Sequence, residues 1–241
     1  MTVQLAPTAV IHDRPFTDLR HTQLDLQALR FMISCTCLAL ETPLALDGAG
    51  LGSESTSSPS GEGQGRGSAP SPLGRGLGRG HSPIIIHQPD PDHWTQRLIL
   101  TQPQRLRDQR PLTVVGFFGL KNTGANVALA QELDRELIPE LTTHAELLAY
   151  VSVCLPTGNF GNLVLFASPE GKDAWGLSAK HSAAVRLLTP DYYAAVRLYN
   201  GHLPGGVAAC ETLRLHLVKY YDYTSRPLWR AVRPLPGGEE L

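Results

Sequence analysis

The spacing of apolar and polar positions changes several times in the second half of the chain, and each change marks an expected element. Residues 112–120 form a short apolar run, which predicts a strand covered on both faces. Gly116 and Gly119 interrupt this run and indicate a bulge or the close approach of another segment. The next segment, 125–141, predicts an amphipathic helix because leucines recur at every fourth position: Leu129, Leu133, Leu137 and Leu141.

A hairpin and a second helix are expected next. The apolar runs 147–155 and 161–167 are separated by turn residues and predict two antiparallel strands. Ser168-Pro169 is typical of a helix start, because serine caps free N–H groups and proline tolerates the first turn. Thr189-Pro190 should end this helix, and Gly176 should weaken it in the middle.

Two tyrosine-rich strands complete the expected order. Residues 192–199 and 212–223 have strand composition, and Asn200-Gly201 is a turn signal after the first of them. The order β-α-β-β-α-β over 112–199 predicts an α+β fold, a ferredoxin-like split βαβ with one antiparallel sheet and helices on one face. Such a sheet leaves its other face open, and we expect a second copy of the chain to cover it.

The first 83 residues differ in composition from the rest. Residues 1–47 are weakly patterned and predict a poorly ordered extension, in which 18–40 can form one helix that has no evident partner element. Residues 48–83 are dominated by Gly, Ser and Pro, which predicts a disordered linker. Arginines among the glycines of this segment are also found in RNA-binding tracts, but their irregular spacing and the lack of aromatic residues favour a plain linker.

Order should begin again near Ile84. The apolar residues 84–87 predict a short strand, and 93–102 predicts a helix that ends before a proline. We therefore assign the folded, barrel-like domain to 84–223 and an extended tail to 224–241.

Charge and cysteine content exclude several functional classes. The 21 basic and 22 acidic residues give a net charge of −1, which provides no general attraction to nucleic acid. The four cysteines are too few for a disulfide framework, and their spacing does not supply a zinc site, so no metal is expected. The apolar run 31–40 is about half of the ~20 residues that cross a bilayer. We expect a cytoplasmic protein that binds neither nucleic acid nor membrane.

The second helix contains Trp175-Gly-Leu-Ser-Ala-Lys-His181, and Pro190-Asp-Tyr-Tyr follows before a strand. With the element order of 112–200, this pattern resembles the dimeric α+β barrel superfamily, which includes the antibiotic-biosynthesis-monooxygenase-like proteins. The resemblance implies a homodimer and a small monooxygenase-like enzyme that acts on a hydrophobic small molecule. It leaves open whether the cofactor is none or haem. By resemblance, Asn122, Trp175 and His181 are the expected catalytic residues, with His181 as the iron ligand in the haem case.

Each of these residues also has a purely structural interpretation. A histidine such as His181 can be a partly buried, hydrogen-bonded group, and Trp175 can be a core anchor. The aromatic residues of the strands, with Phe118, Tyr193 and Tyr199 as the pocket candidates, can line a ligand pocket or form a dimer interface. The alternative function is therefore a non-catalytic homodimeric protein that binds a ligand or a partner on the same scaffold.

Overall fold

A computed structural model describes residues 1–41, 84–89, 95–108, 110–155, 159–187 and 189–236. Within this part of the chain, nine strands form one sheet in the order β1-β9-β8-β7-β4-β6-β5-β3-β2. Neighbouring strands are antiparallel except β1 and β9, which are parallel, so the sheet is mixed and not purely antiparallel as predicted. The strands are β1 (Thr2–Gln4), β2 (Ile84–Pro89), β3 (Thr95–Leu100), β4 (Leu112–Lys121), β5 (Leu147–Cys154), β6 (Phe160–Phe166), β7 (Tyr193–Leu203), β8 (Arg214–Asp222) and β9 (Trp229–Pro234).

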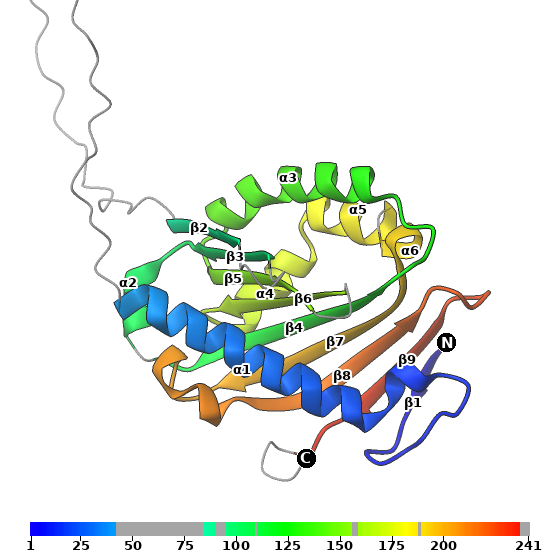
Figure 1. Cartoon of the computed structure of the whole chain (residues 1–241). Helices are drawn as coiled ribbons and strands as arrows, with labels where there is room; N and C mark the ends of the chain where they lie inside the picture. The colour runs from blue at the N-terminus through cyan, green and yellow to red at the C-terminus, as the bar shows by residue number, and fades with distance from the viewer. Residues whose placement is uncertain (42–83, 90–94, 109, 156–158, 188, 237–241) are drawn as a thin grey trace, which may run out of the picture.

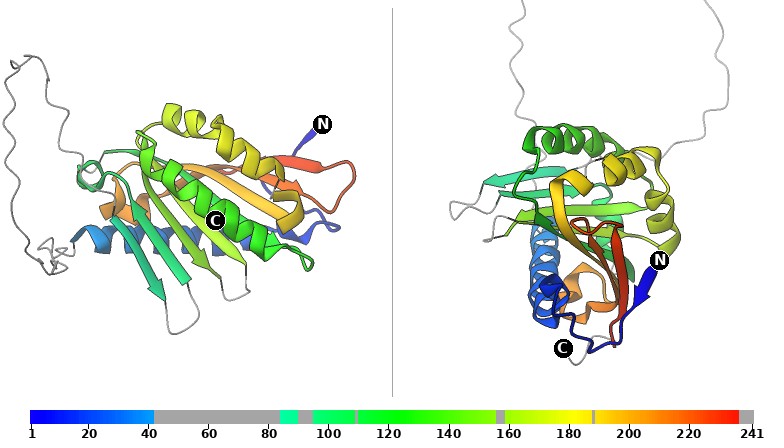
Figure 2. Two further views of the ribbon diagram at one scale, coloured as in Figure 1. Left: turned by 90° about the horizontal axis from the view of Figure 1, so that it is seen from above. Right: turned by 90° about the vertical axis from the view of Figure 1, so that its right-hand side faces the viewer.

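Helices lie on both faces of the sheet. The long helix α1 crosses one face, and α3, α4 and α5 lie on the other (Figure 1, Figure 2). The prediction of helices on one face only is therefore wrong, because it gave the helix expected at 18–40, which is α1, no place on the sheet. The α-helices are α1 (Leu19–Glu41), α2 (Pro103–Arg107), α3 (Val127–Thr143), α4 (Pro169–Gly176), α5 (Ala179–Leu187) and α6 (Thr189–Tyr192); the 3-10 helices are η1 (Pro15–Thr17) and η2 (Val207–Thr212).

The central elements confirm the predicted order of strands and helices. The predicted helix after the hairpin is broken beside Gly176 into α4 and α5, as expected from the glycine. Ser168 caps α4, since its Oγ accepts a hydrogen bond from the Gly171 N–H at 3.0 Å. The turn expected at Asn200-Gly201 is wrong: β7 continues through both residues, and its register with β8 shifts at this point. A β-bulge therefore takes the place of the turn.

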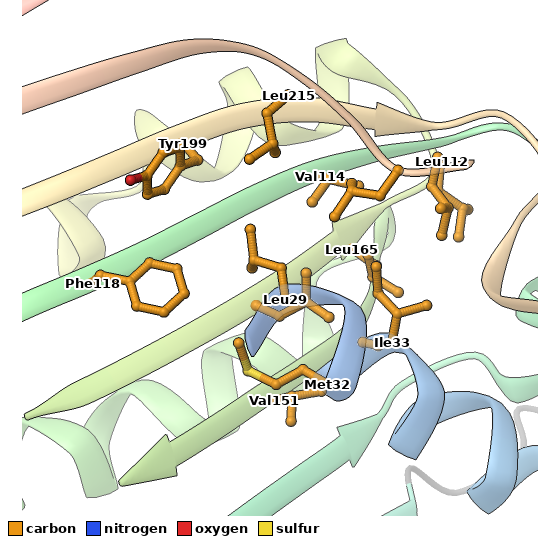
Figure 3. Packing of buried hydrophobic residues seen from close by; sticks show 14 of the residues in the cluster. Leu29, Met32, Ile33, Leu112, Val114, Phe118, Val151, Leu165, Tyr199 and Leu215 are labelled. Carbon is orange, nitrogen blue, oxygen red and sulfur yellow. The ribbon is translucent and has the colours of Figure 1, made fainter. Parts of the chain in front are cut away.

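Helix α1 forms the main hydrophobic core with the sheet. Leu29, Met32 and Ile33 are fully buried and point at Val114 and Phe118 of β4 and at neighbouring strands (Figure 3). The helix contacts the sheet along one side because its buried residues recur at three- and four-residue steps. The prediction that 1–47 is a poorly ordered extension is therefore wrong for residues 1–41, which also supply strand β1.

Two further expectations change near the sheet edges. Residues 95–100, predicted as part of a helix over 93–102, form strand β3 between β2 and β5. Leu98, Ile99 and Leu100 are all buried, and a run with apolar groups toward both faces is a covered strand. The predicted tail at 224–241 contains β9, which pairs with β8. The predicted linker, 48–83, lies outside the described residues.

None of the helices in the described part of the chain is long and apolar enough to span a membrane.

Candidate functional site

The register of the central strands identifies the side chains beneath α3, α4 and α5. Val115 of β4 packs with Trp175 in the hydrophobic cluster on this face. Because residues paired across strands share a face, Asn200 of β7, the partner of Val115, points to the same side. Two residues further along β4, Phe117 also faces the helices, and it pairs with Asn162 of β6.

The two faces of the sheet differ in how completely they are covered. On β4, the residues that face α1 are buried, whereas Thr113, Val115 and Phe117 on the other face are only partly buried. On the neighbouring strands, Asn162 and Leu198 are also partly buried beneath the helices, whereas Val164, Phe166 and Asn200 on the same face are buried. The centre of the sheet is thus fully covered by α1 on one side and less evenly covered on the other.

Two buried amide atoms on this face have no hydrogen-bond partner in the described part of the chain. Asn162 Oδ1 and Asn200 Nδ2 are shielded from solvent, and neither makes a hydrogen bond to any residue that the structure describes. Asn200 as a whole is only 8% exposed. A buried polar group left without a partner costs roughly 1–3 kcal/mol. This face of the sheet therefore carries one acceptor and one donor without a partner among the described residues.

Aromatic rings border the same region at the far end of β4. The ring of Tyr193 contacts Phe117 with a centroid distance of 5.2 Å and an interplanar angle of 67°. Tyr193 also lies over Gly119, where an added Cβ would stand 2.1 Å from the ring. The glycine thus accommodates a side-chain ring and not the close backbone approach or bulge that was predicted, because only a residue without a side chain leaves room for this tyrosine.

Trp175 and His181, two of the three expected catalytic residues, contact each other. Their ring centroids are 5.2 Å apart, and His144 packs edge-on against the other part of Trp175 at 5.7 Å. Burial lowers the pKa of His181 below its ordinary value, and the negative charge of Glu140 offsets part of that shift. His181 is therefore a neutral imidazole at neutral pH, able to donate and to accept a hydrogen bond.

Asn122, the third expected catalytic residue, lies in a different place. It follows β4, and its N–H donates to the Tyr192 carbonyl at 2.8 Å. There it lines a pocket of about 500 Å³. Tyr193 is a second predicted residue in that pocket, whereas Trp175 and His181 are not among its lining residues; the full lining is Asn122, Gly124, Asn126, Pro190, Asp191, Tyr193, Tyr223, Thr224 and Arg226.

Phe118 and Tyr199, the other predicted pocket residues, lie on the opposite face, beneath α1. Their rings meet edge-on at 5.8 Å, and both are almost completely buried. The Tyr199 hydroxyl donates to Asp25 at 2.8 Å. The structure thus separates these two side chains from Tyr193 and places them in the core.

Sequence reasoning missed Asn162 and Asn200 as site residues. Asparagine is depleted in strands, so an asparagine within an apolar strand is the signal that could have identified Asn162. The Asn200-Gly201 pair is a turn signal in the sequence, so Asn200 is expected in a turn and not in a strand. Only the strand register reveals that both amides face the same layer of helices.

The described residues contain no group of three or more His, Cys, Asp or Glu side chains placed to hold a metal ion. For haem, the expected iron ligand, His181, packs on the Trp175 ring, and Asn122 lines a separate pocket. The three residues therefore do not form one haem site.

Comparisons with known proteins place the chain in no family. No family model matches it, and no curated protein matches it. Two solved structures are similar to part of it: protein SO0527 from Shewanella oneidensis and the NE2512 protein of unknown function from Nitrosomonas europaea. They are 18% and 17% identical, each over 39% of this chain and over 92% and 90% of their own lengths, with TM-scores of 0.35 and 0.34. At these TM-scores the likeness carries no argument about fold or function.

Proposed function

We propose that this protein binds a small, mainly apolar molecule between the central strands and the layer of α3, α4 and α5. The observation that carries the proposal is the pair of buried, unpartnered amide atoms, Asn162 Oδ1 and Asn200 Nδ2. A ligand that donates to the first and accepts from the second removes both desolvation costs at once. Val115, Phe117 and Leu198 supply the apolar surface beside the amides.

We infer that strands β7-β4-β6-β5, with α3 and the α4–α5 pair, are a ferredoxin-like core. The strand order and the chain order β-α-β-β-α-β support this assignment. Homodimerisation stays a prediction, but the sheet face that was expected to form the dimer interface is not open. Because α1 covers the second face of the sheet, a dimer has to use another surface.

Indole is a suitable first probe, because it combines an aromatic body with one N–H donor for Asn162 Oδ1. In the full chain, we expect indole to shift the NMR resonances of the Asn162 and Asn200 side-chain amides. Asn200→Leu should have opposite effects on stability and on ligand binding. It should raise the free energy of unfolding by up to about 1–3 kcal/mol, because a buried unpartnered amide is gone, and it should weaken ligands that accept from this amide.

The matched control is Thr36→Val, a buried polar-to-apolar change on the α1 side of the sheet. Thr36 Oγ1 donates to the Met32 carbonyl at 2.9 Å, so the variant should lose stability and leave indole binding unchanged. The proposal is rejected if Asn200→Leu destabilises the fold and no probe shifts the amide resonances. Ordered water would then satisfy these amides.

A monooxygenase-like enzyme acting on a hydrophobic small molecule is the second candidate. It is supported by the contact between Trp175 and His181 and by the neutral state of His181. A haem form would depend on His181 without Asn122, which lies in a separate pocket; it predicts a Soret band when haemin is added to the full chain, with loss of the band in His181→Ala. If haemin gives the same spectrum with both proteins, His181 has no role as a haem ligand.

A further inference from the structure

The pocket that contains Asn122 is a separate candidate site, built from three segments that are far apart in the sequence. The β4–α3 connection contributes Asn122 and Gly124, α6 contributes Asp191, and the β8–β9 connection contributes Tyr223 and Arg226. Its volume of about 500 Å³ lies within the range of small-molecule sites, roughly 300–1,000 Å³. Tyr193 forms the wall that faces Phe117 and the central strands.

The pocket lining carries one charge of each sign, on Asp191 and on Arg226. Among the described residues, neither Asp191 nor Arg226 has an oppositely charged side chain within 4.0 Å. Within the described part of the chain, Arg226 Nη1 donates to the Tyr223 carbonyl at 3.2 Å, which leaves most of the guanidinium donors available. The two charges line one pocket from different elements without pairing with each other, so a molecule between them can contact both.

The wall that carries Arg226 is held in place by Asp222. This carboxylate accepts hydrogen bonds from the Thr224 N–H at 3.0 Å, the Thr224 hydroxyl at 2.6 Å and the Ser225 hydroxyl at 2.7 Å. Arg14 adds an ion pair to Asp222 at 3.4 Å. A connection fixed by these contacts loses little conformational freedom when a ligand binds.

The rings of Tyr193 and Tyr223 supply the apolar part of the pocket. Tyr223 stacks on Tyr221 with a centroid distance of 6.3 Å and an interplanar angle of 13°. Burial, with a smaller contribution from Tyr221, raises the pKa of Tyr223 to about 12, so its hydroxyl stays neutral and able to donate at physiological pH.

The Asn122 side-chain amide makes no hydrogen bond to the described residues, which leaves it available to a ligand.

We propose that this pocket binds a zwitterionic α-amino acid with an aromatic side chain. Arg226 contacts the carboxylate, Asp191 contacts the ammonium group, and the rings of Tyr193 and Tyr223 pack on the side chain. A lone cation or anion would leave the second charge of the pocket unused, whereas a zwitterion of this class matches both charges and the rings between them.

The test uses L-phenylalanine as the probe, with calorimetric titration of the full chain. N-acetylphenylalanine lacks the ammonium group, and phenethylamine lacks the carboxylate; each should bind roughly five-fold more weakly than phenylalanine, as expected for one exposed charge pair. Arg226→Gln should weaken phenylalanine by a similar factor and leave phenethylamine unchanged. Asp191→Asn should weaken phenylalanine and leave N-acetylphenylalanine unchanged.

A space-filling variant separates this site from the rest of the molecule. An added Cβ at Gly124 meets nothing within 4 Å, so Gly124→Phe should fold normally and fill the pocket. Gly176 is equally open but lies outside the pocket lining, so Gly176→Phe is the matched control and should keep phenylalanine binding. Equal affinity of the three probes, or binding that Gly124→Phe leaves intact, would overturn the proposal. Neither result depends on Asn162 or Asn200, so the outcome is independent of the proposed function.

Discussion

The ion pair between Asp25 of α1 and Arg197 of β7 provides a direct test of how α1 is attached to the sheet. Arg197 Nε and Nη2 donate to the two Asp25 oxygens at 2.5 and 2.9 Å, and the Tyr199 hydroxyl donates to the same carboxylate at 2.8 Å. The side chains of Asp25 and Arg197 are only 4% and 12% exposed. Asp25→Ala therefore leaves a buried guanidinium and a buried phenol without their main acceptor.

The expected loss of stability follows from that burial. Removing one partner of a buried, hydrogen-bonded ion pair costs about 3–5 kcal/mol, because the remaining charge has no compensation. By contrast, the double variant Asp25→Leu with Arg197→Met removes both charges and replaces them with apolar groups of similar size. Such replacements are close to neutral, and Tyr199 retains Thr22 Oγ1 at 3.4 Å. The double variant should therefore be at least about 2 kcal/mol more stable than Asp25→Ala.

Urea unfolding followed by tryptophan fluorescence and by circular dichroism measures these differences. Arg20→Ala is a suitable control, because Arg20 forms an exposed ion pair with Asp18 outside the core, and such pairs contribute little. An Asp25→Ala variant that loses less than about 1 kcal/mol would refute the reasoning, since α1 would then be held by apolar contacts alone.

Three further predictions concern the glycine contact, the histidine and the N-terminal segment. Gly119→Ala should cost about 1–3 kcal/mol in urea unfolding because its Cβ would meet the Tyr193 ring at 2.1 Å, whereas Gly124→Ala should stay within about 0.5 kcal/mol. The pKa of His181 is lowered in the folded state, so the unfolded chain binds its proton more readily; stability should be full above about pH 6.5 and fall as the pH decreases toward the folded pKa. His181→Gln should flatten part of that slope in urea titrations. Removal of residues 1–41 uncovers the core face of β4 and should produce self-association in light scattering, whereas a chain that stays a stable monomer would show that α1 is dispensable.

The central elements could be predicted because their signals are local. The apolar run at 112–121, the serine cap at Ser168 and the glycine break at Gly176 each act within a few residues. The position of helix α1 on the sheet could not be predicted, for the opposite reason. Its buried side is defined only by contacts with strands more than 70 residues away in the sequence, and its exposed side carries Leu24, Phe31 and Leu38, which obscure the amphipathic pattern.

The candidate sites were predicted less well than the fold, because they depend on strand register. Trp175 and His181 lie close together in the sequence, and their contact follows from a helix break. Asn162 and Asn200 are brought to the same face only by the pairing of β6 and β7 with β4. Phe118 and Phe117 are neighbours on one strand, so alternation alone places one in the α1 core and the other beneath α3 and α5.

The two faces of the sheet are physically linked. A slip of one residue in any central strand would exchange the two faces, so the tightly packed α1 side fixes the register for both. Val114 and Phe118 are held against α1, and this contact sets Val115 and Phe117 beneath the other helices. Asn200 and Asn162 are the cross-strand partners of Val115 and Phe117, so the strands, and not α3 or α5, set the spacing of the two amides. A rigid core on one side thus allows an incompletely covered, hydrogen-bonding surface on the other.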